Sequence, residues 1–374
     1  MTAKLRVLQI SHDYKGPFQN ICKLYCEAFP NCDVTTLYLR GTGDARVVEA
    51  TGGNQTLFFE RPEGSLRGLK LGTLWHLFKL FQNNRYDIVI AHRYKAIYLA
   101  GIVSFFFPIK VIYGVAHEFK IFHRTLRAFF ITRLRPDIQV IAVSNSLADD
   151  IIADCPSLGI QSRIHVLENA IDPTLEREIV SRDEARKRFD LPVNVFCFGT
   201  VGRLIARKYQ DLLIKAYSQV AAPDNCLVVV GSGPQESSLK TLAINLGIEQ
   251  QVIFVGNVDQ AYKYYRAFDA FVFTSDNREA FGVVLLEAML AKVPVICSDA
   301  NMPREIVAAT GLIFQTGDVD ELVKQMKRLK SLDEDQYRSM QQSGFDRVIT
   351  EFAANRFVQR CQELPQLASF GGRL

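Results

Sequence analysis

The chain alternates short apolar runs with longer stretches in which apolar residues recur at helical spacing. Continuous apolar strands separated by helices are typical of a parallel sheet that helices cover on both faces. We therefore predict an α/β fold. In the first half of the chain, the predicted strands are residues 6–11, 33–39, 87–92, 110–116, 138–144 and 163–169.

This alternation stops at residues 172–194, DPTLEREIVSRDEARKRFDLPVN, a charged segment with two prolines and no strand pattern. We interpret the segment as a linker or an exposed connecting helix. Because the strand pattern then resumes, the chain is predicted to form two α/β domains of similar size, with helices at the C-terminus. The strands predicted in the second half are residues 195–203, 226–233, 251–257, 270–275, 293–299 and 311–314.

Composition agrees with two domains and excludes some classes of protein. The chain has 374 residues, 48% of them hydrophobic, and a single core rarely grows past ~250–300 residues. A net charge of +4 is too small to indicate a nucleic-acid partner, so none is expected. The eight cysteines form no C-x-x-C motif and are interpreted as reduced thiols of a cytosolic protein.

The sequence predicts neither a membrane span nor a signal peptide. Residues 96–116 are the most apolar stretch, but Pro108 and Lys110 divide it near the middle. A membrane span needs ~20 apolar residues without such a break, so a buried helix followed by a buried strand is predicted. The N-terminus opens directly into a strand pattern. A cytoplasmic location is expected.

The stretch TSDNREAFGVVLLEAM, residues 274–289, is the first candidate site. It reads as a strand end, a polar loop and a helix that begins near Gly282, and the free N–H groups of such a helix start bind phosphate or sugar oxygens. Glu279 and Glu287 would lie ~12 Å apart along a helix, whereas retaining glycosidase carboxylates lie ~5–5.5 Å apart. They suit two separate parts of one long ligand. The alternative is that Glu279 favours the helix dipole and Glu287 is a solvated helix residue.

Residues 199–217, GTVGRLIARKYQDLLIKAY, place Arg203 and Lys208 in a turn that follows a buried strand. Two cations beside a helix start suit a diphosphate, although a solvated basic turn is the simpler interpretation. The turn in VVVGSGPQ, residues 228–235, lacks the full G-x-G-x-x-G pattern, so tight packing of the turn is its default explanation.

The first half of the chain offers weaker signals. Gly16 could bring the backbone close to a ligand, and His117 follows a strand, where ligand-binding residues of such sheets lie. No histidine or cysteine spacing predicts a metal site. Residues 118–136 are predicted to form a basic, aromatic amphipathic helix that packs on the sheet or lies on an anionic membrane, and residues 65–81 have a similar character.

Taken together, these motifs resemble the retaining GT-B glycosyltransferases of group 1, also called family 4. The resemblance rests on VGRL…K at 201–208, VVVGSGP at 228–234, VIFVGNV at 252–258 and REAFGVVLLEAMLAKVPVICSD at 278–299, which holds an E-x7-E signature. It implies two Rossmann-like domains, residues 1–180 and 181–350, facing each other across a cleft. Residues 351–374 would form a C-terminal helix that returns to the N-terminal, acceptor-binding domain.

The resemblance also implies a role for each candidate residue. Arg203 and Lys208 would neutralise the donor diphosphate, and Glu287 would bind ribose hydroxyls. His117 would lie against the donor sugar, and Gly16 would lie near the phosphates and the acceptor, although the chain reads KGPF where the family often has Gly-Gly. Lys292 replaces a usual glycine. The transferred sugar would be held by Glu279 and the amides of Ala280, Phe281 and Gly282, and Val258 and Val283 complete the predicted substrate-binding set.

The expected activity is transfer of a sugar from a nucleotide sugar, with UDP favoured, to a glycan or glycolipid such as lipopolysaccharide core. Neither a cofactor nor a metal is expected, because cations and a helix start can stabilise the leaving diphosphate. Two alternatives remain: a non-catalytic sugar- or lipid-binding module of the same fold, and a dinucleotide-dependent oxidoreductase. The oxidoreductase needs a complete G-x-G-x-x-G motif, and the sequence has none.

Overall fold

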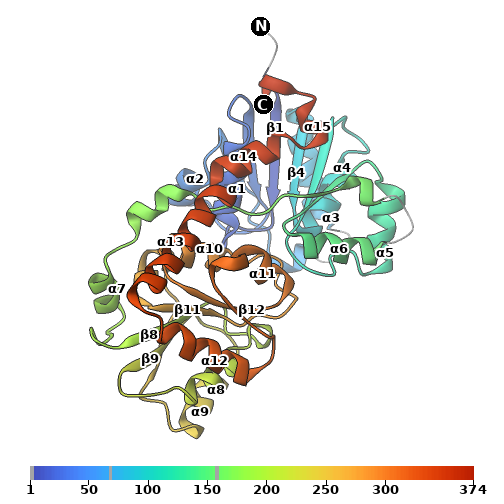
Figure 1. Ribbon diagram of the computed structural model, residues 1–374. Helices are drawn as coiled ribbons and strands as arrows, with labels where there is room; N and C mark the ends of the chain where they lie inside the picture. The colour runs from blue at the N-terminus through green and yellow to red at the C-terminus, as the bar shows by residue number, and fades with distance from the viewer. Residues whose placement is uncertain (1–3, 67–69, 156–159) are drawn as a thin grey trace. The chain divides into compact units, whose positions relative to one another are not determined.

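The computed structural model describes residues 4–66, 70–155 and 160–374, and the chain divides into two compact units (Figure 1). The N-terminal unit comprises residues 1–170 and 354–374, and the C-terminal unit comprises residues 171–353. The chain's last helices therefore belong to the N-terminal unit.

The N-terminal unit is built on a seven-stranded parallel sheet with strand order β3-β2-β1-β4-β5-β6-β7. The six predicted strands are confirmed, and a short edge strand, β3, was not predicted. The strands are β1 (Arg6–Ser11), β2 (Asp33–Tyr38), β3 (Gln55–Phe58), β4 (Ile88–His92), β5 (Val111–Ala116), β6 (Gln139–Ala142) and β7 (Ile164–Val166).

Helices cover this sheet, and those that follow β4 and β6 begin close to the ends of their strands. The C-terminal α14 packs on α1 through the rings of Tyr25 and Phe357, whose centroids are 5.0 Å apart. The helices are α1 (Phe18–Glu27), α2 (Ala45–Thr51), η1 (Glu63–Leu66), α3 (Leu71–Asn83), α4 (Arg93–Val103), α5 (Thr125–Phe129), η2 (Phe130–Leu134), α6 (Asn145–Asp154), η3 (Ile160–Arg163), α14 (Ala354–Gln362), α15 (Pro365–Ala368) and η8 (Gly371–Arg373).

The C-terminal unit has a six-stranded parallel sheet with order β10-β9-β8-β11-β12-β13, and all six strands were predicted. The strands are β8 (Phe196–Val201), β9 (Asn225–Val230), β10 (Val252–Gly256), β11 (Ala270–Phe273), β12 (Val295–Ser298) and β13 (Leu312–Phe314). Its helices are η4 (Pro173–Glu178), α7 (Arg182–Arg188), η5 (Ala206–Lys208), α8 (Gln210–Ser218), α9 (Glu236–Asn245), η6 (Ala261–Ala267), α10 (Val283–Leu290), α11 (Asn301–Val307), η7 (Ala308–Thr310), α12 (Val319–Lys330) and α13 (Glu334–Glu351).

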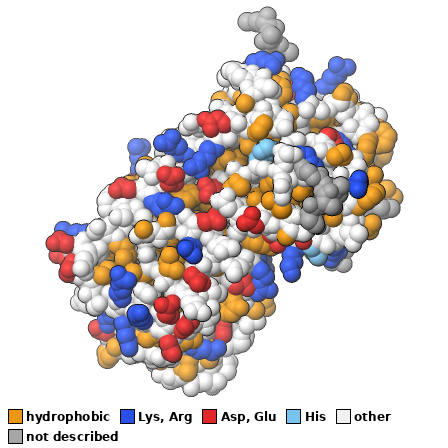
Figure 2. All heavy atoms as spheres, turned by 45° about the vertical axis from the view of Figure 1, so that its right-hand side comes forward, with side chains coloured by type: hydrophobic (Ala, Val, Ile, Leu, Met, Phe, Trp, Pro, Cys, Tyr) orange, Lys and Arg blue, Asp and Glu red, His pale blue; other side chains and the backbone are white. Residues whose placement is uncertain are grey.

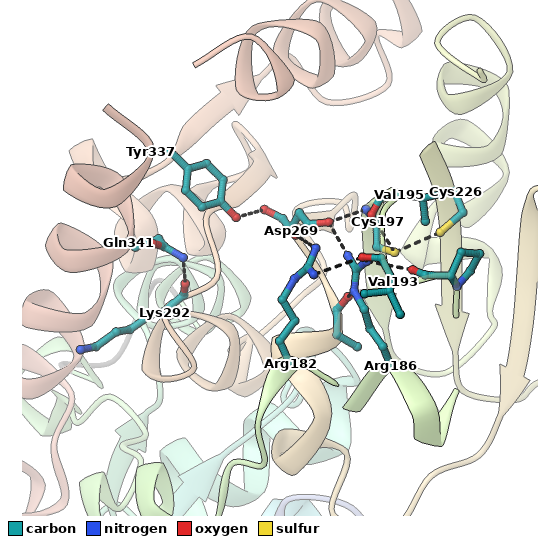
Figure 3. Close-up of polar contacts among 12 residues, drawn as sticks. Arg182, Arg186, Val193, Val195, Cys197, Cys226, Asp269, Lys292, Tyr337 and Gln341 are labelled. Atoms are coloured by element: carbon teal, nitrogen blue, oxygen red, sulfur yellow. Dashed lines mark hydrogen bonds and ion pairs between the residues drawn. The ribbon is translucent and has the colours of Figure 1, made fainter. Parts of the chain in front are cut away.

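The segment 172–194 belongs to this unit, so its interpretation as a linker was wrong. The alternative, an exposed connecting helix, is confirmed in part, because α7 forms and most of its residues are exposed. The segment is no linker because it packs into the unit. Arg186 of α7 is 1% exposed, and its Nη2 lies 2.6 Å from Oδ2 of Asp269, which follows η6; this contact is drawn in Figure 3. The same carboxylate oxygen accepts a hydrogen bond of 2.7 Å from the Cys197 amide of β8. Its other oxygen lies 2.9 Å from Arg182. The Asp269 carboxylate therefore links α7 to β8 through these contacts.

The eight cysteines are buried and free, which agrees with their interpretation as thiols. Two of them, Cys197 and Cys226, are register partners on neighbouring strands, with 3.1 Å between their sulfur atoms (Figure 3).

The stretch 96–116 forms the expected buried helix and strand, α4 and β5. The helix predicted over 118–136 is shorter, because α5 and η2 together run only from Thr125 to Leu134. Phe122 lies before this helix and is fully buried. Residues 67–69 of the similar stretch 65–81 lie outside the described residues, and α3 begins at Leu71. Within the described ranges, no helix is both long enough and apolar enough to cross a membrane.

Candidate active site

The first candidate feature is the start of α10, where the loop from β11 ends. Gly282 is the N-cap, as predicted, but its N–H is already used and lies 3.1 Å from the sulfur of Met302. The amides of Ala280, Phe281 and Val283 form no hydrogen bond to any described residue. Free amides at a helix start attract anions and sugar oxygens, so these three, rather than Gly282, are available to a ligand.

Lys208 and Glu279 meet beside this helix start. The Lys208 ammonium forms an ion pair with Oε2 of Glu279, and both side chains are mostly buried, 16% and 13% exposed. The Thr274 hydroxyl donates a hydrogen bond of 2.6 Å to the Lys208 carbonyl, which fixes η5 against the loop. An ammonium has three donors, so Lys208 keeps the capacity to bind a phosphate while it holds Glu279.

Arg203 lies in the turn after β8 and is exposed. Its guanidinium forms no hydrogen bond or ion pair with any described residue, so it is available to an anion. The turn that holds Arg203 packs against the glycine-rich turn after β9. A Cβ on Gly233 would lie 2.4 Å from the Leu204 carbonyl oxygen, and one on Gly231 would lie 2.0 Å from that of Gly202. Tight packing, the predicted explanation of VVVGSGPQ, therefore accounts for both glycines.

Glu287 lies in α10, and its Oε2 accepts a hydrogen bond of 2.8 Å from the Tyr265 hydroxyl of η6. Burial raises the pKa of Glu287, and the hydrogen bond from Tyr265 acts in the opposite direction. Glu287 is thus a half-buried, oriented acceptor rather than the solvated residue of the alternative interpretation. Two other predicted residues, Val258 and Phe281, are partly buried and pack against the core of the unit. Tyr265 and Thr274 were not predicted, because only tertiary packing brings them here.

The remaining candidates, Gly16 and His117, belong to the N-terminal unit. Gly16 is exposed, between β1 and α1, with a φ of +60°. His117 follows β5, and the edge of the Phe18 ring packs on it with centroids 5.1 Å apart. The Nε2 atom of His117 lies 3.0 Å from Nδ1 of His92.

Across residues 4–66, 70–155 and 160–374, no three His, Cys, Asp or Glu side chains are grouped so that they could hold a metal ion.

The sequence matches the glycosyl transferases group 1 over residues 181–347 and Glycosyltransferase Family 4 over residues 31–175. The chain belongs to this glycosyltransferase family. The two matched regions fall in the C-terminal and the N-terminal unit, respectively, apart from the few residues that cross the boundary at residue 170. The family assignment therefore covers both sheets.

Curated relatives in the family are similar over part of their length. A GDP-mannose-dependent monoacylated alpha-(1-6)-phosphatidylinositol monomannoside mannosyltransferase of Corynebacterium glutamicum is 40% identical over 131 residues, 32% of this chain and 34% of that protein. A lipopolysaccharide core biosynthesis glycosyltransferase, LpsD of Rhizobium meliloti, is 30% identical over 49% of this chain and 52% of that protein. The chain thus spans about a third to a half of the relatives' length.

Solved structures show the same fold over the whole chain. The Anabaena protein HepE in complex with UDP and glucose superposes with a TM-score of 0.82, covering 98% of this chain and 100% of that one, at 21% identity. A glycosyltransferase from Rickettsia africae gives a TM-score of 0.83 at 17% identity, over 99% of both chains. The fold is that of the GT-B glycosyltransferases, as predicted.

Proposed function

We propose that this protein is a retaining glycosyltransferase that transfers a sugar from a nucleotide diphosphate sugar, with a UDP-sugar favoured, without a metal. One observation carries the proposal: the ion pair of Lys208 and Glu279 lies beside the free amides at the start of α10. The site offers a cation, a carboxylate and N–H donors, and a sugar diphosphate needs all three. The UDP complex of HepE supports the choice of base.

In the reaction, the bond between the anomeric carbon and the donor phosphate breaks, and negative charge grows on the leaving diphosphate. Arg203, Lys208 and the amides of α10 stabilise that charge. An acceptor hydroxyl attacks the same face of the sugar, its oxygen forms the new bond, and its proton passes to the leaving phosphate. Glu279 holds the transferred sugar, and Glu287 binds the ribose hydroxyls.

A ligand screen tests this proposal. A bound ligand raises stability by mass action, so UDP and its sugars are expected to raise the melting temperature more than GDP, ADP or their sugars, with or without EDTA. The anomeric configuration of the product is then compared with that of the donor by NMR. Binding without turnover in the presence of acceptors would favour the non-catalytic binding module, and an inverted product would reject the retaining mechanism.

The proposed acceptor is a glycan or glycolipid, and lipopolysaccharide core or a surface polysaccharide is the favoured class. Support comes from the relatives, since one is named for lipopolysaccharide core biosynthesis and another for a phosphatidylinositol mannoside acceptor. Transfer to deacylated and acylated forms of one acceptor separates a requirement for the glycan from a requirement for the lipid.

We further propose that the N-terminal unit docks on an anionic membrane, on the cytoplasmic face of the inner membrane. Large apolar side chains are exposed on three neighbouring segments: α3, the turn after α4, and α5 with η2. They include Leu71 at 70% exposure, Phe106 at 66% and Leu126 at 82%. The complete set is Leu71, Trp75, Phe105, Phe106, Leu126, Phe129 and Leu134.

Aromatic and cationic contacts join the three segments into one surface. The rings of Phe78 and Phe106 are 5.5 Å apart, and the Arg135 guanidinium lies 4.8 Å from the Phe105 ring. Exposed basic residues, Lys79, Arg124 and Arg133, lie on the same segments. Figure 2 shows hydrophobic and basic side chains side by side on this unit. Aromatic and basic residues together suit the interface of an anionic bilayer.

Trp75 reports directly on this docking, because it is the chain's single tryptophan and lies within the surface. We expect vesicles that contain phosphatidylglycerol to shift its fluorescence to the blue, and neutral vesicles or high salt to have little effect. The double variant Phe105→Ser, Phe106→Ser should bind these vesicles at least ~10-fold more weakly. Replacing the exposed Ile244 and Leu246 of the other unit by serine should leave vesicle binding unchanged. An unshifted spectrum with no co-sedimentation would contradict the docking.

The raised pKa of Glu287 predicts a pH dependence of nucleoside binding. Because its pKa is raised, Glu287 takes up a proton at a higher pH than an ordinary glutamate as the solution is acidified. The protonated carboxyl accepts fewer hydrogen bonds from ribose, so uridine affinity should fall as pH drops through the raised pKa. Glu287→Gln should weaken binding ~2- to 10-fold at neutral pH and remove this dependence. Calorimetric titration between neutral and mildly acidic pH measures both effects.

A further inference from the structure

A row of three polar side chains, two of them buried, crosses the sheet of the N-terminal unit and ends at the half-buried His117. Gln9 lies in β1, His92 is the last residue of β4, and His117 directly follows β5. These strands are neighbours in the sheet order β1-β4-β5. Gln9 and His92 are fully buried. Buried polar groups in a row need matched donors and acceptors, so the hydrogen positions can be derived from one end.

The amide of Gln9 fixes the first step. Its Nε2 donates hydrogen bonds to the Cys22 carbonyl at 3.1 Å and to Oγ1 of Thr36 at 3.0 Å. A carbonyl oxygen can only accept, so the amide nitrogen must face Cys22 and Oε1 must face the other way. Oε1 lies 2.9 Å from Nε2 of His92. Since Oε1 can only accept, Nε2 of His92 carries the hydrogen.

The second step follows from the ring of His92. Burial lowers the pKa of His92 to about 3, so the ring is neutral and its Nδ1 is an acceptor. Nε2 of His117 lies 3.0 Å from this Nδ1 and must therefore carry a hydrogen. Burial, and then the neighbouring His92 and Arg93, lower the pKa of His117. The Nδ1 atom of His117 is thus an unprotonated acceptor, and no described residue donates to it.

Ring contacts hold both imidazoles in this arrangement. The Tyr25 ring packs edge-on against His92 with centroids 5.0 Å apart, and the Phe18 ring does the same against His117 at 5.1 Å. The Arg93 guanidinium covers Phe18 at 3.9 Å from the ring centroid. Rotation of either imidazole would break these contacts together with the hydrogen bonds.

We infer that Gln9 and His92 are positioning residues that hold His117 in the Nε2–H tautomer, so that its Nδ1 accepts a hydrogen bond from a sugar hydroxyl. The hydroxyl as ligand rests on the proposed function. The tautomer rests on the hydrogen bonds and on the burial that keeps both rings neutral, and it does not depend on the proposed function. In this form His117 orients a sugar and has no proton at Nδ1 to donate to the leaving group.

The test is nitrogen NMR of the full chain labelled with 15N-histidine, without ligand. Long-range proton–nitrogen correlations distinguish protonated from unprotonated ring nitrogens, and the chain has only six histidines. The expected result is that His92 and His117 both carry hydrogen at Nε2 only. A hydrogen at Nδ1 of His117, or a doubly protonated ring at neutral pH, overturns the inference and leaves the proposed glycosyl transfer untouched.

Two variants of His92 test the consequence for the reaction. His92→Phe keeps the ring and removes the acceptor, so His117 should populate both tautomers and kcat should fall ~3- to 10-fold, the loss expected for one hydrogen bond. His92→Asn offers an amide oxygen near the position of Nδ1 and should restore the tautomer and most of the rate. Affinity for UDP, which lacks the sugar, should stay unchanged in both variants.

The readouts separate the two ideas. Equal losses of kcat in both variants, or a loss of kcat that parallels the fall in melting temperature, would mean that His92 has a merely structural role. Either result would overturn the inference. Absence of transfer by the unmodified protein with every donor and acceptor would reject the proposed function. The tautomer spectrum would still decide whether His117 is held as described.

Discussion

Replacing Glu279 by glutamine is expected to lower the rate of sugar transfer at least ~100-fold, because the transferred sugar loses the carboxylate that positions it. The change keeps the size of the side chain and removes its charge. It also releases Lys208 from its ion pair, so affinity for UDP should stay the same or rise. Initial rates with a UDP-sugar and calorimetric binding of UDP measure the two effects separately.

Glu236→Gln is the matched control, because Glu236 forms an exposed ion pair with Lys240 on α9 in the same unit. This control should transfer sugar at the normal rate, since exposed pairs of this kind contribute little. If Glu279→Gln also retained near-normal turnover, Glu279 would lie outside the active site. If it lost UDP binding as well, the side chain would serve the nucleotide rather than the sugar.

The largest expected effect on stability comes from Arg186→Ala. The change removes a buried guanidinium that binds Asp269 and also donates to the carbonyls of Pro192 and Val193 at 2.9 and 2.6 Å. Breaking a buried ion pair by removing one partner costs ~3–5 kcal/mol, which corresponds to a fall in melting temperature on the order of 10 °C for a unit of this size. Calorimetry of the full chain should show this fall in melting temperature.

Arg182→Ala provides the control within the same cluster. Arg182 contacts the same carboxylate at 2.9 Å but its side chain is 44% exposed, so its loss should cost about 1 kcal/mol or less. Equal losses from both substitutions would show that burial of Arg186 does not determine the stability of this unit.

The strands could be predicted because each central strand of a parallel sheet is a continuous apolar run. β3, QTLF at Gln55–Phe58, escaped prediction because it is a short edge strand with a polar first residue. The interpretation of the segment 172–194 as a linker failed for a different reason. Its charges look solvated in sequence, and only the fold reveals that Asp269 neutralises Arg186. The same limit applies to Phe122, which is buried although its neighbours are basic.

The site could be predicted as a set of motifs but not as a set of contacts. The sequence located the start of α10 at Gly282, and the structure places the N-cap there. It could not predict that Met302 uses the amide of Gly282, or that Lys208 pairs with Glu279. Lys292, which replaces a usual glycine, has a φ of +59°, and this explains why glycine is favoured at that position.

The central claim is that the donor's diphosphate binds between Arg203, Lys208 and the start of α10. The most direct test compares the affinities for UDP and uridine in the double variant Arg203→Ala, Lys208→Ala, with Lys215→Ala, Lys240→Ala as a control of equal charge. We predict a fall in UDP affinity of roughly 100-fold, since each charged contact contributes ~1.5–3 kcal/mol, and little change for uridine. Equal losses for UDP and uridine, or an unchanged affinity for UDP, would contradict the claim.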